Sequence, residues 1–118
     1  MFGTKLEETV KDVAGGMAAI VMGFDGIPVD QYAEDADQDI ETLGMEFSVL
    51  LKEVRKAAEM LDAGAAEELT VRTEKLSTIL RIINDEYFVA LVIAPYGNIG
   101  KARYLLRVIA PGFARELV

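Results

Sequence analysis

The chain has 118 residues and a formal net charge of −8, which predicts one domain, residues 1–118, large enough to bury a core without disulfides. It contains no cysteine and no histidine, which excludes disulfides, thiolate sites and the commonest catalytic base and zinc ligand. The acidic charge argues against a nucleic-acid partner. No apolar run resembles a signal peptide or reaches the roughly 20 residues of a membrane span, so we expect a soluble, cytoplasmic protein.

The first predicted element is a short helix over Thr4–Ala14. Thr4 can cap it, and Glu7, three residues later, completes a capping box. Leu6, Val10 and Val13 recur at helical spacing and predict one apolar face.

A β-hairpin is predicted next. Residues Met17–Phe24 are apolar on both faces of a strand, and Asp-Gly at positions 25 and 26 is typical of a tight turn. The second strand, Ile27–Tyr32, contains Pro28, which cannot donate a ladder hydrogen bond. We therefore place this strand at a sheet edge.

Acidic side chains dominate the connector Ala33–Asp39 and its surroundings. No basic residue occurs between Lys11 and Lys52, whereas the acidic residues in this interval include Asp25, Asp30, Glu34, Asp35, Asp37, Asp39, Glu41 and Glu46. Negative charge before a helix favours the helix dipole, so capping and solubility are the plain interpretation. The alternative is an acidic lip that meets a basic partner. A metal or acid–base site at Asp35 and Asp37 is not favoured, because no apolar wall perturbs a pKa there.

The longest helix is predicted over Asp39–Ala63. Apolar residues at spacings of three and four predict its core stripe, which consists of Ile40, Leu43, Phe47, Leu50, Val54, Ala57 and Leu61. A second, mostly small row runs beside it and consists of Gly44, Ser48, Leu51, Arg55 and Ala58. Glycine inside a helix costs about 1 kcal/mol relative to alanine, so Gly44 indicates either close approach of another backbone or an ordinary weak spot.

Three further strands are predicted as a meander. Residues Glu67–Glu74 alternate between apolar and polar side chains, and Leu76–Ile83 follows. Residues Tyr87–Ala94 carry no charge and are apolar on both faces, which predicts a central strand covered by helices on each side. The outermost strand, Glu67–Glu74, has no proline and no bulge signal to protect its edge, so we expect it to pair with a second copy.

A final helix is predicted after Asn98, its cap. Its inward positions are Ile99, Ala102, Leu105, Leu106, Ile109 and Phe113, and its outer face carries Lys101, Arg103, Arg107 and Arg115. Pro111 lacks a donor and clashes one turn back, which predicts a kink or a fresh helix start near residues 110–112.

Residues 97–101, Gly-Asn-Ile-Gly-Lys, follow a strand and open a helix, as a phosphate-binding loop does. That loop needs a glycine where Pro95 stands and a serine or threonine where Ala102 stands. We therefore expect no cofactor, and neither a catalytic nor a metal site.

Taken together, these segments resemble the Roadblock/dynein light-chain family, above all its shorter, MglB-like bacterial members. The first hairpin, GMAAIVMGFDGIPV at 16–29, resembles that of the family. The strand YFVALVIA at 87–94 and the helix start NIGKARYLLR at 98–107 look like its last strand and last helix. The resemblance implies an α/β (α+β) sandwich with a five-stranded, mainly antiparallel sheet in strand order 2-1-5-4-3. The long helix is expected on one face of the sheet, with the N- and C-terminal helices on the other.

The resemblance further implies a homodimer in which two edge strands join and two long helices pair. The unguarded strand and the small row of the long helix give the expected dimer interface: Gly44, Ser48, Leu51, Arg55, Ala58, Leu69, Thr70, Val71 and Arg72. Family members bind and regulate small Ras-like GTPases without catalytic residues of their own. Contacts to such a partner are expected at Glu41, Glu46, Lys52 and Arg55.

Three alternatives to a GTPase regulator stay open. One is a structural or signalling adaptor without effect on GTP turnover. Another is a small-ligand sensor with a pocket between sheet and helix, which uniformly apolar core stripes do not favour. An enzyme is disfavoured by the absence of histidine, cysteine and any cofactor loop.

Overall fold

The computed structural model describes residues 2–117, so the two terminal positions of the predicted domain, 1 and 118, lie outside the described residues. In chain order the elements are α1 (Gly3–Asp12), β1 (Gly16–Gly23), β2 (Pro28–Ala33), α2 (Ile40–Met60), β3 (Glu68–Arg72), β4 (Ser77–Ile82), β5 (Tyr87–Ile93) and α3 (Ile99–Glu116). The strands form one antiparallel sheet in the order β2-β1-β5-β4-β3, which confirms the predicted fold class and strand order.

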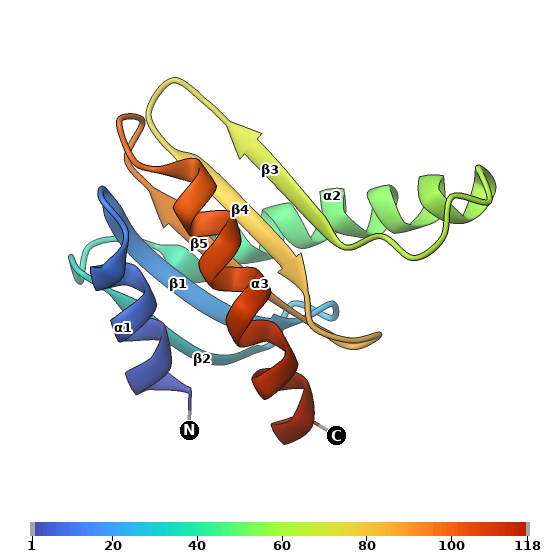
Figure 1. Ribbon diagram of the computed structural model, residues 1–118, viewed down its shortest axis with the longest axis horizontal. Coiled ribbons are helices and arrows are strands. Elements are labelled where there is room, and N and C mark those ends of the chain that lie inside the picture. Colours follow the sequence, from blue (N-terminus) through green and yellow to red (C-terminus); the bar gives the residue numbers. More distant parts are fainter. Residues whose placement is uncertain (1, 118) are drawn as a thin grey trace.

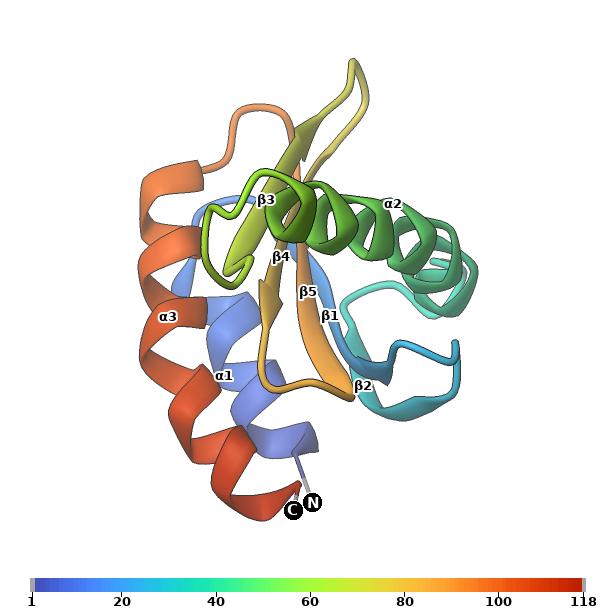
Figure 2. The same cartoon turned by 90° about the vertical axis from the view of Figure 1, so that its right-hand side faces the viewer.

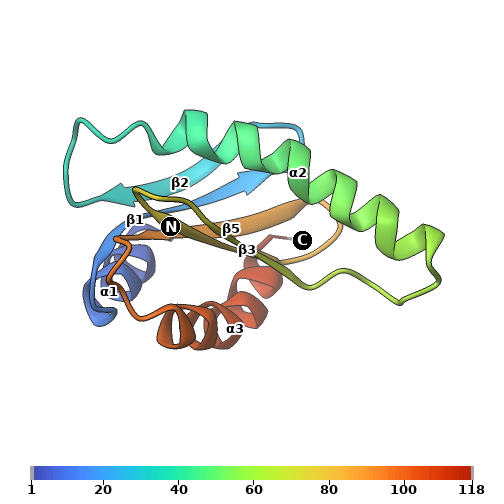
Figure 3. The same cartoon turned by 90° about the horizontal axis from the view of Figure 1, so that it is seen from above.

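The molecule has three layers (Figure 1). Helix α2 lies on one face of the sheet, where it packs on β1 and β2. Helices α1 and α3 lie side by side on the other face, as the edge-on view of Figure 2 shows. Seen from above, the C-terminal end of α2 projects past the strands (Figure 3). The helices therefore cover the sheet unevenly, and the α2 layer is the incomplete one.

The central strands are buried on both faces. Val89 and Leu91 of β5 belong to the core under α1 and α3, and Phe88 and Ala90 belong to the core under α2. This alternation follows from the two-residue period of a strand, and it requires apolar residues at every position when both faces are covered. The prediction that this segment is a doubly covered central strand is confirmed.

The hairpin β1–β2 turns where the sequence predicted. The Asp25 carboxylate accepts a hydrogen bond from the Ile27 N–H at 3.0 Å, and Gly26 has a φ of 86° that side chains disfavour. Strand β2 is an edge strand that begins at Pro28, as the missing proline donor requires.

Helix α1 starts earlier than predicted. Phe2 is its N-terminal flanking residue, no side chain caps the helix, and the capping box predicted at Thr4 is wrong. The Phe2 side chain is buried, its ring meets Phe113 of α3 at 4.8 Å, and its N–H donates to Asp30 at 2.9 Å. Tertiary burial of an aromatic side chain thus sets this helix start, where the sequence pattern indicated a polar cap.

Helix α2 begins as predicted and ends sooner. The Asp39 carboxylate caps it by accepting hydrogen bonds from the Thr42 N–H at 3.0 Å and the Thr42 hydroxyl at 2.6 Å. The predicted end at Ala63 is three residues too long, because Asp62 adopts a left-handed conformation with a φ of 51°. The chain then turns at Gly64, whose φ is 86°.

Helix α3 is capped by Asn98, whose side-chain oxygen accepts from the Lys101 N–H at 3.0 Å, as predicted. Of the two outcomes predicted near residues 110–112, the fresh helix start is wrong, since the helix runs without interruption from Ile99 to Glu116, and the kink stays a prediction. Ala110 and Phe113 on either side of Pro111 are both buried against the sheet layer. Packing of these neighbours holds the helix together despite the missing donor of the proline.

Candidate interaction surface

The small row of α2 faces the chain's own sheet. Gly44, Ser48 and Leu51 are buried there together with Ile40. A Cβ on Gly44 would lie 3.0 Å from Cε and 3.1 Å from Sδ of Met22 on β1. The absence of a side chain at Gly44 therefore leaves room for the Met22 side chain. We predicted Gly44, Ser48 and Leu51 to lie in the dimer interface, and the structure instead buries them on the side of α2 that faces the chain's own sheet.

Arg55 and Ala58, from the same row, are half-buried at the other end of α2. The Arg55 guanidinium lies 4.4 Å from the centre of the Phe24 ring and donates to the backbone carbonyl of Asp85 at 3.2 Å. A second guanidinium nitrogen is 3.7 Å from the Asp85 carboxylate. Arg55 therefore links α2 to the β4–β5 turn. Its guanidinium is engaged within its own chain and not presented to a second copy or to a partner.

The apolar row predicted as core lies on the flank of α2, and only Ile40 at its start is fully buried. We call the rest the flank row: Leu43, Phe47, Leu50, Val54, Ala57 and Leu61. Leu50 is 46% exposed and Leu61 is 76% exposed, whereas Leu43 and Phe47 are half-buried against the core. The prediction of this row as a continuous core stripe is thus wrong beyond Phe47. The chain leaves an apolar stripe of its longest helix in solvent.

Three further apolar residues of α2 are exposed, and the sequence pattern did not single them out. Met45 is 52% exposed, Val49 is 55% exposed and Met60 is 82% exposed. The sequence does contain a signal for these exposed residues, because α2 carries apolar side chains around more of its circumference than one contact with the sheet can bury. A surface helix with more than one apolar face indicates a second covered face.

Strand β3 is the open edge beside the flank row. It pairs only with β4 within residues 2–117, so its outer backbone groups face away from the sheet. Leu69 and Val71 lie on the α2 side and are half-buried, whereas Thr70 and Arg72 lie on the α3 side and are exposed. These four predicted interface residues therefore occupy an edge strand, as the alternating pattern indicated.

The predicted partner contacts do not form one patch. Glu41, Glu46 and Lys52 are all exposed on α2. Lys52 follows Glu41 by eleven positions, which puts both on one side of the helix. Glu46 is five residues from Glu41 and so points about 140° away from it at roughly 100° per residue.

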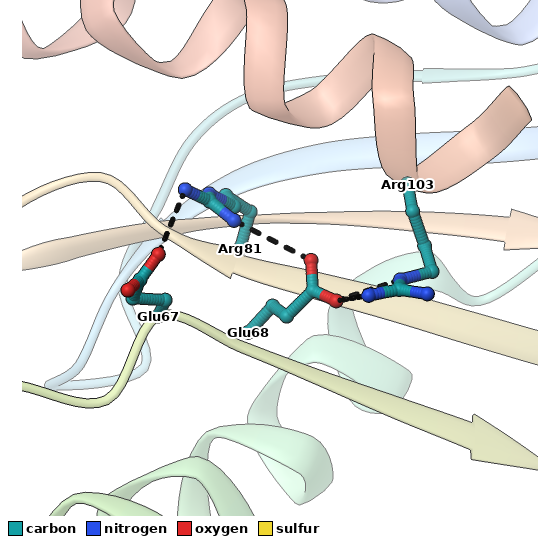
Figure 4. A network of polar contacts seen from close by, with 4 residues as sticks. All are labelled: Glu67, Glu68, Arg81 and Arg103. Carbon is teal, nitrogen blue, oxygen red and sulfur yellow. Dashed lines mark hydrogen bonds and ion pairs between the residues drawn. The ribbon is translucent and has the colours of Figure 1, made fainter. Parts of the chain in front are cut away.

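A polar network ties the edge strand to α3 (Figure 4). Arg81 of β4 lies 3.4 Å from the carboxylates of both Glu67 and Glu68. Glu68 of β3 also accepts from Nε of Arg103 at 2.6 Å and pairs with its terminal nitrogen. Glu68 is therefore held between two guanidinium groups, one from the sheet and one from the helix.

The glycine at the rejected phosphate loop has a packing explanation. A Cβ on Gly97 would lie 2.7 Å from the carbonyl oxygen of Ala14 and 3.0 Å from that of Ala94, so only glycine fits this close backbone approach. Acidic side chains within residues 2–117 do not gather in groups of three that could hold a metal ion. Over the same residues, no helix has both the length and the hydropathy that crossing a bilayer demands.

Comparison with solved structures adds the family. The chain is 43% identical to MglC from Myxococcus xanthus over 98% of both chains, with a TM-score of 0.69. It is 15% identical to a Roadblock/LC7 domain from Streptomyces avermitilis, over 95% of this chain and 93% of that one, with a TM-score of 0.85. It is 17% identical to the gliding protein MglB from Thermus thermophilus, over 93% and 83% of the two chains, with a TM-score of 0.82.

The last two likenesses show the fold, and the identity with MglC extends over nearly the whole chain. A scan against protein-family models found no match, and neither did a search of curated proteins. The sheet order, the three-layer arrangement and the relationship to MglC all agree with the resemblance seen in the sequence. The chain belongs to the Roadblock/LC7 family.

Proposed function

We propose that this protein is a homodimeric, non-enzymatic module that binds and regulates a small Ras-like GTPase. One observation carries the proposal: the flank row of α2 leaves apolar side chains in solvent on the same face of the sheet as Leu69 and Val71 of the open edge strand β3. An edge strand and an apolar stripe on one side of a molecule are both liabilities unless another chain covers them.

A second copy covers both features at once. A two-fold axis through the middle of β3, near Thr70, pairs this strand with its own copy in antiparallel register and joins two five-stranded sheets. The same axis brings the two flank rows together on the α2 side. Leu50 and Val54 then pack against the same residues of the partner, as an isologous interface requires.

The outward face of α2 remains free in such a dimer. Met45, Val49 and Met60 are exposed apolar residues of α2 outside the flank row, and the charged residues Glu41 and Lys52 lie on the same helix. Apolar anchors surrounded by charged groups are the usual composition of a protein–protein interface. We place the GTPase on this face, where two α2 helices side by side present one platform.

Regulation in this proposal acts by contact. The chain has no histidine and no cysteine, and Arg55 of α2 and Arg81 of β4 are held by internal partners. A rigid platform that binds one conformation of a GTPase better than another shifts the partner toward that conformation. Relatedness to MglC and MglB supports a place in this family of regulators.

The test combines binding with turnover. A small Ras-like GTPase encoded in the same genome is captured on the wild-type protein, and GTP hydrolysis is measured with and without the dimer. Val49→Glu should abolish capture, and Tyr96→Glu in the loop before α3, at a side chain that is 83% exposed, should not. Capture without a change in turnover identifies a passive adaptor, and equal capture by both variants removes α2 from the partner surface.

A further inference from the structure

The outer face of α3 combines positive charge with exposed apolar surface. We call five exposed side chains of its first three turns the α3 patch: Lys101, Arg103, Tyr104, Arg107 and Val108. Tyr104 is 54% exposed and Val108 is 55% exposed. No acidic residue occurs in the sequence from Tyr87 to Arg115, although the whole chain carries a net charge of −8. Helix α3 therefore carries a local excess of positive charge in an acidic protein.

The α3 patch borders a groove of about 550 Å³ between α3 and the strands β3 and β4. Its polar lining consists of Glu67, Glu68, Arg81, Arg103, Tyr104 and Arg107. The two glutamates are engaged by Arg81 and Arg103, as Figure 4 shows for the network that ties α3 to β3. Because Glu68 fixes the Arg103 guanidinium, the remaining N–H donors of Arg103 are held at the groove without a further loss of side-chain entropy.

Arg107 is the cation without an acidic partner at this groove. It forms no ion pair within residues 2–117, and its guanidinium lies 5.6 Å from the centre of the Tyr104 ring. Arginine binds carboxylates with two parallel donors, and arginine and tyrosine are the residue types that most often dominate binding energy at interfaces. This pair can therefore hold a carboxylate beside an apolar side chain.

We propose that the groove between α3 and β3 docks an acidic segment of a partner protein, with carboxylates on Arg107 and Arg103 and an apolar side chain on Tyr104. Helix α3, which lines the groove, lies on the opposite face of the sheet from α2 (Figure 2), so this inference does not rest on the proposed GTPase surface. Both surfaces can be occupied at the same time.

The shape of the site favours a peptide over a membrane, and the overall charge favours a peptide over an extended polyanion. A groove can hold single side chains, whereas the surface of a bilayer is flat. An extended polyanion also approaches the other acidic residues of this chain within the roughly 8 Å over which charges interact at physiological salt. A peptide segment places its carboxylates at the arginines alone.

The probe is a fluorescein-labelled peptide of alternating glutamate and leucine, and its binding to the wild-type protein is followed by fluorescence polarisation. Arg107→Glu should weaken binding about tenfold, because it replaces an attraction by a repulsion, and added salt should weaken it as well. Tyr104→Ala should weaken binding without changing its salt dependence. Lys56→Glu on α2, the same charge reversal on an exposed lysine, should have no effect.

Equal binding by Arg107→Glu and Lys56→Glu overturns the proposal, as does wild-type affinity no higher than for a serine–leucine peptide. Binding to vesicles of equal parts phosphatidylcholine and phosphatidylserine, lost in Arg107→Glu, assigns the surface to membranes instead. Salt-sensitive assembly beyond the dimer in sedimentation, lost in the same variant, assigns it to a second copy. Circular dichroism of each variant establishes that the fold is intact, which the exposed positions lead us to expect.

Discussion

Leu50→Glu is the substitution that most directly tests the proposed dimer. Leu50 lies in the middle of the flank row and is 46% exposed in the single chain. Glutamate has nearly the same helix propensity as leucine, so the change leaves the helix itself intact. Any effect on association then comes from the surface that the side chain presents.

The magnitude follows from the exposed part of the side chain. Full burial of a leucine contributes about 1.5–3 kcal/mol, so burying the exposed half in each of two copies contributes a similar amount to the dimer. Leaving a carboxylate without a partner in that interface costs roughly 1–3 kcal/mol more for each copy. These contributions add up to about 3.5–9 kcal/mol, so we expect a loss of at least about 4 kcal/mol, which raises the dimer dissociation constant about 1,000-fold or more.

Analytical ultracentrifugation over a range of concentrations measures this constant for wild type and variant. Val108→Glu is the matched control, since Val108 is 55% exposed on α3, away from the proposed interface. Thermal unfolding followed by circular dichroism checks that each variant folds. A folded Leu50→Glu protein with the wild-type dissociation constant would refute the assignment of the flank row to the dimer.

Three other predictions concern the fold. Gly44→Leu should lower the free energy of unfolding by about 1–3 kcal/mol by overpacking against Met22, and an unchanged urea midpoint would contradict the contact described. Hydrogen bonds from the Thr42 side chain and backbone lower the pKa of Asp39, so its ionised cap stabilises the fold above the unfolded-state pKa and loses this effect as pH falls through the folded-state value. The stability difference between wild type and Asp39→Asn in urea unfolding should therefore shrink on acidification, and a constant difference would exclude this cap as the cause. Pro111→Ala should raise the melting temperature, because it restores a backbone hydrogen-bond donor and because alanine is about 3 kcal/mol more favourable than proline in a helix interior. An unchanged or lower melting temperature would contradict this and would mean that packing of the proline ring offsets the lost hydrogen bond.

Much of the fold was predictable because its signals are local. Asp39 and Asn98 precede apolar runs and have the side chains that cap helices, and both do so. Asp25-Gly26 marks a turn, and Tyr87–Ile93 is apolar at every position because both faces are covered. In each case the structural feature is determined by one residue and its near neighbours in the chain.

The candidate surface was predictable only in part. The open edge of β3 follows from its alternating pattern and the absence of proline, and the structure places the strand there. For α2 we predicted that the larger side chains of the flank row form the core and that the small row faces a second copy. In the structure the small row faces the sheet, and most of the flank row is exposed or half-buried. Small residues face the sheet because Met22 and Ile20 of β1 fill the space beneath Gly44.

Local patterns in the sequence are enough to predict which segments are helices and strands, where most of them begin, and which strand lies at the centre. Packing between distant segments sets how far α2 is rotated about its own axis, starts α1 at a buried Phe2, and lets α3 continue through Pro111. The two groups differ in how far apart along the chain the interacting residues lie. Caps and turns are made between residues a few positions apart, whereas the rotation of a helix is set by side chains on strands far from it in sequence.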